Sequence, residues 1–175
     1  MPDTNPPAKS EPTFTVTNPA DAEAPIAPSA DGPKLILIAE DDPFISRMYQ
    51  IKLESAGFKV IVKNNGRDAF EAIKSEHPNL AVLDINMPEL SGLEVLGALQ
   101  NDSFDFSVMP VIVLTNSSEL SDRNTAHSFG AEYLVKAELT PRQVLDMISQ
   151  KLGIAKEGDP ADTDPKDGKA GKGLK

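Results

Sequence analysis

The chain has 175 residues, a formal net charge of −10 and no cysteine, and 39% of its residues are hydrophobic. The absence of cysteine excludes a disulfide framework, a thiolate metal site and a cysteine nucleophile. Because nucleic-acid binding relies on cationic contacts to phosphate, we do not expect so acidic a chain to bind nucleic acid directly. No apolar run approaches the ~20 residues of a membrane helix, and residues 1–33 show no signal-peptide pattern. We therefore expect a cytoplasmic protein with no membrane partner.

Proline divides the chain into three parts. Eight of the 15 prolines fall in residues 1–33, where a packed core is not expected because proline lacks a backbone donor. Residues 155–175 are rich in Gly, Lys and Asp and contain too few apolar side chains to form a core. The sequence therefore predicts a disordered Pro/Ala-rich tail over 1–33, one compact domain over 34–154, and a flexible charged tail over 155–175.

Short apolar runs alternate with segments of helical spacing through the central part of the chain. The apolar runs predict five strands, over residues 35–39, 58–62, 80–83, 111–114 and 132–135. Helices are expected from Pro43 to just before Gly57, from the 64–66 turn to His77, over about 93–99 and 118–129, and from Pro141 to Gly153, with Thr140 as N-cap. This (βα)5 order predicts the α/β class with a doubly wound five-stranded parallel sheet.

Four of the five predicted strands are followed by polar or charged residues. These are the run Glu40-Asp41-Asp42, then Asp84, Thr115 and Lys136. Sites in doubly wound sheets lie beyond the carboxyl ends of the strands, so these groups are expected to gather there. Clustered carboxylates repel one another unless a cation compensates, and Mg²⁺ prefers such oxygen ligands. Lys136 and Thr115 suit a phosphoryl oxyanion, and Asp84 is the candidate nucleophile for an aspartyl phosphate.

Each of these residues also has an ordinary structural explanation when it is considered alone. The acidic run fits a solvated loop, Asp84 a helix cap, and Thr115 a strand-end hydroxyl that bonds the backbone. Lys136 fits a surface charge, and Tyr133 an aromatic side chain that covers the core at a sheet edge. Their occurrence together at successive strand ends favours the functional interpretation.

Residues 34–154 resemble the response regulator receiver (CheY-like) family of two-component signalling. The resemblance rests on the acidic run at residues 40–42, on Asp84 to Pro88 with Gly92 beyond it, on Thr115, and on Tyr133 to Lys136 in the last strand. It implies the flavodoxin/CheY-like strand order 2-1-3-4-5. It also implies that the partners are a histidine kinase or a histidine phosphotransfer protein and a downstream protein target, with a phosphorylation-dependent homodimer left open.

The resemblance further assigns a role to each matching residue. Asp84 is implied as phosphoacceptor, and Asp41, Asp84 and the backbone carbonyl of Asn86 as the Mg²⁺ ligands, with Glu40 acting through water. Lys136 would pair with the phosphoryl group, and Thr115 would move towards it. Tyr133 would then turn inward and repack the surface of the fourth helix, fifth strand and fifth helix. The chain is expected to catalyse its own phosphorylation and slow dephosphorylation, and not to be a metabolic enzyme.

Two positions, Ala137 and Asn116, depart from the family pattern. Ala137 stands where many receivers have a proline joined by a cis bond, and without proline we expect a trans bond. Asn116 follows the conserved hydroxyl, where the family usually has a small residue, and together with Asn86 it is expected to restrict or alter access to the phosphoryl group.

We expect a stand-alone phosphorylation switch, and two other functions are its alternatives. The main alternative is a phosphate-independent adaptor, which the full set of expected site residues disfavours. An aspartyl-phosphate phosphatase usually needs a second carboxylate two residues beyond the nucleophile. That position is Asn86, which disfavours a phosphatase.

Overall fold

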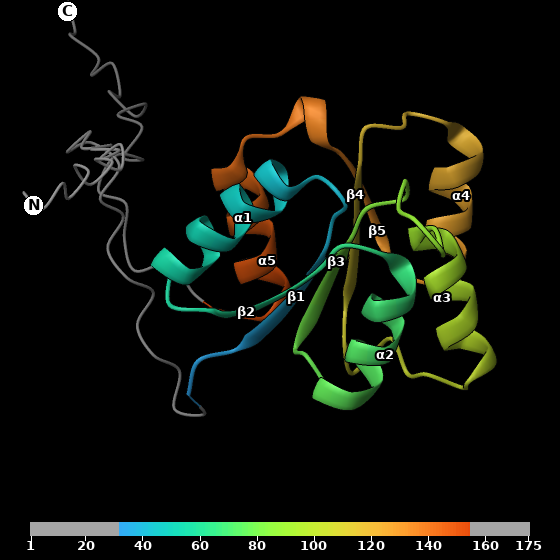
Figure 1. Ribbon diagram of the computed structural model, residues 1–175, viewed down its shortest axis with the longest axis horizontal. Coiled ribbons are helices and arrows are strands. Elements are labelled where there is room, and N and C mark those ends of the chain that lie inside the picture. The colour runs from blue at the N-terminus through green and yellow to red at the C-terminus, as the bar shows by residue number, and fades with distance from the viewer. Residues whose placement is uncertain (1–31, 155–175) are drawn as a thin grey trace, which may run out of the picture.

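A computed structural model of the chain describes residues 32–154, which form one α/β layer structure (Figure 1). The predictions for the tails over 1–33 and 155–175 fall almost wholly outside the described residues. The elements in chain order are β1 (Leu35–Ala39), α1 (Pro43–Ser55), β2 (Lys59–Lys63), α2 (Gly66–Glu76), β3 (Leu80–Leu83), α3 (Gly92–Asn101), β4 (Val111–Thr115), α4 (Leu120–Ser128), β5 (Glu132–Val135), the 3-10 turn η1 (Lys136–Glu138) and α5 (Pro141–Lys151).

The five strands form one parallel sheet in the order β2-β1-β3-β4-β5, which confirms the predicted fold class and strand order. Helices α1 and α5 cover one face, and α2, α3 and α4 cover the other (Figure 1). Each face has its own cluster of buried apolar side chains. The central strands β1, β3 and β4 are buried on both faces, which explains their unbroken apolar sequences.

Local hydrogen bonds explain where several helices begin. The Asp42 carboxylate accepts hydrogen bonds from the N–H groups of Phe44 and Ile45 and so caps α1. Thr140 caps α5 as predicted, and forms a reciprocal capping box with Gln143. The caps place the starts of α1 and α5 at the same end of the sheet, next to the carboxyl ends of the strands.

The structure differs from the sequence prediction mainly at element ends. Helix α4 begins at Leu120, two residues later than expected, because Ser117 and Glu119 belong to a hydrogen-bonded loop before it. The chain after β5 forms the short turn η1, and no peptide bond in residues 32–154 is cis, so the trans bond predicted before Ala137 is confirmed. Within the same residues, every helix is too short or too polar to span a bilayer.

Candidate phosphoacceptor and metal site

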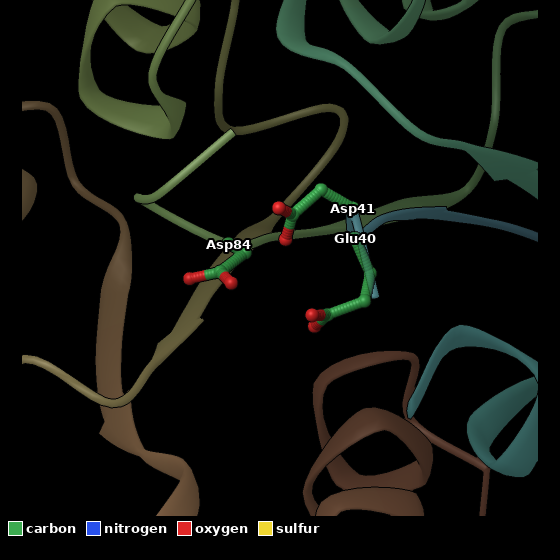
Figure 2. A group of neighbouring side chains, drawn as sticks. All are labelled: Glu40, Asp41 and Asp84. Carbon is green, nitrogen blue, oxygen red and sulfur yellow. The ribbon is translucent and has the colours of Figure 1, made fainter. Parts of the chain in front are cut away.

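Three carboxyl groups meet at the carboxyl end of the sheet. Glu40 and Asp41 follow β1, Asp84 follows β3, and ligand oxygens of all three lie within 4.8 Å of one another (Figure 2). The backbone N–H of Asp84 donates to the Ala39 carbonyl at 2.9 Å, which holds the two strand ends in register. The Asp42 carboxylate caps α1 instead, while the Asp42 backbone N–H donates to the Glu40 carboxylate.

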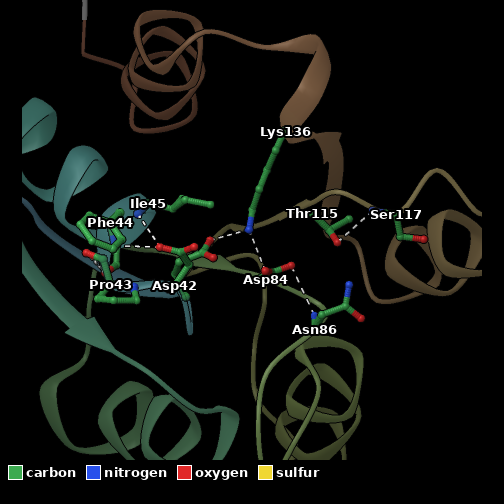
Figure 3. Close-up of polar contacts among 11 residues, drawn as sticks. Asp42, Pro43, Phe44, Ile45, Asp84, Asn86, Thr115, Ser117 and Lys136 are labelled. Carbon is green, nitrogen blue, oxygen red and sulfur yellow. Dashed lines mark hydrogen bonds and ion pairs between the residues drawn. The ribbon is translucent and has the colours of Figure 1, made fainter.

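Lys136 contacts two of the three carboxyl groups. Its Nζ is 2.5 Å from a Glu40 carboxylate oxygen and 2.7 Å from Oδ2 of Asp84 (Figure 3). Its side chain is only 7% exposed, and those of both partners are buried as well. The pairing therefore takes place largely out of water, where an unpaired charge would be costly.

Burial and pairing change the protonation of these groups in defined directions. Burial raises the pKa of Glu40, and Asp84 raises it further, while the hydrogen bond and charge of Lys136 oppose the rise. Burial by itself would lower the pKa of Lys136, but hydrogen bonds and charge from Asp84 and Glu40 raise it overall. Lys136 therefore stays protonated at neutral pH, and the site still carries fewer positive than negative groups.

The donor set of the site fits a hard divalent cation. All three acidic side chains offer oxygen atoms, and Asp41 is exposed while Glu40 and Asp84 are buried, so the cluster opens to solvent on one side. Mg²⁺ binds one or two carboxylates and keeps several waters, which such a half-open cluster allows. Burial and, to a lesser extent, the charge of Asp84 raise the pKa of Glu40, and added positive charge would oppose that rise.

Two glycines allow the backbone to pack closely at the loop between β3 and α3, which follows Asp84. Asn86 is exposed, and its N–H donates to Oδ1 of Asp84 at 3.3 Å. A Cβ on Gly92 would lie 2.2 Å from the Asp84 carbonyl oxygen, and one on Gly66 would lie 1.9 Å from the Leu90 carbonyl oxygen. The sequence analysis assigned Gly66 only to a turn, because the contact joins residues that are distant in the chain.

A second set of contacts links the end of β4 to β5 and α4. Thr115 is fully buried, and its Oγ1 accepts a hydrogen bond from the Ser117 N–H at 3.3 Å. The Tyr133 hydroxyl donates to the Ser117 carbonyl at 2.7 Å, and the Arg123 guanidinium lies over the Tyr133 ring, 5.3 Å from its centroid. The sequence predicted Thr115 and Tyr133 but missed Ser117 and Arg123, since neither residue type at these positions carries a signal.

The structure thus brings most of the predicted site residues to one end of the sheet. Glu40, Asp41, Asp84 and Lys136 lie together, with Asn86 beside Asp84. Buried Thr115 and exposed Asn116 lie at the end of β4, which pairs with β3 on one side and β5 on the other. Figure 3 shows the Thr115 side chain on the Asn86 side of the Lys136–Asp84 contact.

A sequence model of the response regulator receiver domain matches residues 36–149. The chain belongs to this family. The described residues form a receiver domain of two-component signalling. The match contains all of β1 except Leu35, the other four strands, and the three residues of the acidic cluster.

Individual relatives and solved structures agree with this assignment. The chain is 39% identical over 117 residues to an uncharacterized transcriptional regulatory protein, YkoG of Bacillus subtilis (strain 168), covering 67% of this chain and 50% of that protein. It is 28% identical over 123 residues to the polar-differentiation response regulator DivK of Brucella anthropi, covering 70% of this chain and 99% of DivK. A CheY-like receiver domain from Methanospirillum hungatei superposes with a TM-score of 0.64 at 28% identity, over 70% of this chain and 95% of that one.

The lengths of these relatives differ in an informative way. The chain spans about half the length of the transcriptional regulators it matches first, but nearly all of DivK. The receiver domain is thus the part common to all of them.

Proposed function

We propose that this chain is a response regulator that accepts a phosphoryl group on Asp84, in the presence of Mg²⁺, and passes the signal on through protein contacts. The observation that supports this most is the Lys136 ammonium placed between two buried carboxylates at the strand ends. Asp84 approaches both the Lys136 ammonium and the loop N–H of Asn86. Such a carboxylate is oriented for attack and has neighbours that neutralise added phosphoryl charge.

The transfer step needs no group of the chain beyond those described. An Asp84 carboxylate oxygen forms a bond to phosphorus as the bond from phosphorus to the donor's histidine nitrogen breaks. The leaving imidazole keeps the electron pair and takes up one proton. Lys136 balances the phosphoryl charge, and Asp41, Asp84 and the Asn86 carbonyl would hold Mg²⁺, with Glu40 acting through water. The bound ion would neutralise phosphoryl oxygens as their charge develops.

Intact mass measurement tests this proposal directly. The chain is incubated with acetyl phosphate and Mg²⁺, and we expect one phosphate adduct on the parent chain and none on Asp84→Asn. The matched control is Asp102→Asn, because Asp102 is an exposed carboxylate at the end of α3, paired with Lys74 and far from the strand ends. An adduct that persists in Asp84→Asn, or its absence from the parent chain, would support the phosphate-independent adaptor instead.

The face of α1 beside the acidic cluster is suited to hold a protein phosphodonor. Phe44, Met48 and Ile51 are exposed at helical spacing, with Phe44 85% exposed. Their stripe starts next to Asp42, at the end of the sheet where Asp84 lies (Figure 3). An amphipathic helix of a histidine kinase or histidine phosphotransfer protein could pack on this stripe while its histidine reaches Asp84.

Substitution on α1 separates docking from chemistry. We expect Ile51→Ser to slow transfer from a purified phosphorylated histidine phosphotransfer protein about tenfold and to leave phosphorylation by acetyl phosphate unchanged. Val108→Ser is the control, since Val108 is 77% exposed but precedes β4, at the opposite end of the sheet. Equal slowing with both donors, or in both variants, would contradict docking on α1.

The surface formed by α4, β5 and α5 is proposed as the switched surface, because Thr115 and Tyr133 connect it to the site through the β4–α4 loop. A phosphorylation-dependent homodimer through this surface stays open. We propose no metabolic activity, and no direct nucleic-acid contact by the receiver domain itself.

A further inference from the structure

Tyr133 is held from two sides by a single segment of the chain. Its side chain is 5% exposed, with the ring under the Arg123 guanidinium and the hydroxyl bonded to the Ser117 carbonyl. Ser117 and Arg123 both belong to the segment that leads from Thr115 into α4. A buried tyrosine hydroxyl needs a hydrogen-bond partner, and a ring face attracts a cation, so both contacts favour the inward orientation.

The segment that holds Tyr133 is braced by its own hydrogen bonds. The Ser117 hydroxyl donates to Oδ2 of Asp122 at 3.0 Å and accepts from the Glu119 N–H at 3.3 Å. Asp122 directly precedes Arg123 in the first turn of α4. The carbonyl that receives the Tyr133 hydroxyl and the cation above its ring are therefore kept at a fixed spacing by Ser117 and Asp122.

We propose that Arg123 is a positioning residue that holds Tyr133 inward and thereby makes the orientation of this ring depend on the placement of α4. A shift of the first turn of α4 would move the guanidinium off the ring, and a shift of the β4–α4 loop would move the Ser117 carbonyl. Either motion weakens the inward orientation. This inference rests on the proposed function only for its consequence in signalling.

The chain has two tyrosines and no tryptophan, which makes Tyr133 observable in the intact protein. With 3-fluorotyrosine incorporated, the ¹⁹F spectrum contains one resonance for Tyr133 and one for Tyr49, assigned with Tyr49→Phe. The difference in chemical shift between H2O and D2O reports solvent access to each ring. Tyr49 is buried in α1 on the other face of the sheet and serves as internal reference.

Three variants test the role of Arg123 in the full chain. Arg123→Met keeps a long side chain but removes the cation, and we expect the solvent shift of Tyr133 to increase at least threefold while that of Tyr49 stays constant. Arg123→Lys restores a cation and should recover part of the parent value. The control is Arg67→Met, which removes an exposed arginine paired with Glu89 at the start of α2, and it should leave Tyr133 unchanged.

An unchanged Tyr133 resonance in Arg123→Met would overturn the proposal, as would equal changes in Arg123→Met and Arg123→Lys. If Arg123→Met also alters Tyr49, Arg123→Lys decides, because it keeps the positive charge. A solvent shift of Tyr133 in Arg123→Lys that lies between the values of the parent and of Arg123→Met then supports the proposal. Any other value contradicts it. The phosphate adduct on Asp84 is measured separately by mass, so failure of phosphoryl transfer and failure of this inference remain distinguishable.

Discussion

At the scale of single residues, Lys136 is the cation that pairs with two buried carboxylates of the site. Burial raises the pKa of Glu40, and the charge of neighbouring Asp84 adds to that rise. The ammonium group of Lys136 contacts both carboxylates and opposes the rise in the pKa of Glu40. The residue types and their places at the strand ends were predicted from the sequence. The 2.5 and 2.7 Å contacts were not, because residues 96 and 52 positions apart meet only after the sheet has formed.

Asn116 is a second residue whose effect can be measured. It is exposed directly after buried Thr115, where its amide side chain is larger than the small residue usual in the family. We expect Asn116→Ala to hydrolyse its Asp84 phosphate severalfold faster, because water reaches the phosphoryl group more easily. The measurement is loss of the phosphate adduct with time, with Asn64→Ala, also exposed, as control. Indistinguishable rates for Asn116→Ala and the parent would contradict this role.

At the scale of elements, nearly all helices and strands were predictable because they depend on local patterns. Continuous apolar runs mark β1, β3 and β4, and proline or a capping residue marks the starts of α1 and α5. The packing of one loop on another was not predictable. The first turn of α2 touches the β3–α3 loop, where the Gly66 N–H donates to the Pro88 carbonyl and Arg67 pairs with Glu89.

Gly66 allows this approach, and its replacement tests the contact. A Cβ at Gly66 would meet backbone at 1.9 Å, so we expect Gly66→Ala to lower the free energy of unfolding by about 2 kcal/mol, as overpacking usually does. Gly97→Ala is the matched control within α3, where the added Cβ meets only Phe129 at 3.9 Å. Alanine in a helix interior should instead stabilise it by about 0.5 to 1 kcal/mol. Urea denaturation measures both, and destabilisation of equal size would refute the contact as the cause.

At the scale of the whole molecule, we expect the acidic cluster to link cation binding to stability. A cation that binds only the folded chain stabilises it, by about 2.7 kcal/mol when its concentration is 100 times the dissociation constant. We expect the urea midpoint of the full chain to rise with Mg²⁺ and to return to its original value after chelation. Asp41→Asn, which removes one carboxylate of the cluster, should abolish most of the rise. An equal rise in parent and Asp41→Asn would place the ion elsewhere.

The sequence by itself determined the class of the fold, the identity of the strand ends and the residue types available for phosphoryl chemistry. These features follow from local periodicity and from the rule that parallel strands in such sheets end at one edge. The tertiary structure alone decided which groups touch: Lys136 between Glu40 and Asp84, Gly66 against the loop around Asp84, and Arg123 over Tyr133. The physical reason is that such contacts depend on strand order, on helix placement and on distances of a few ångströms, none of which local sequence patterns encode.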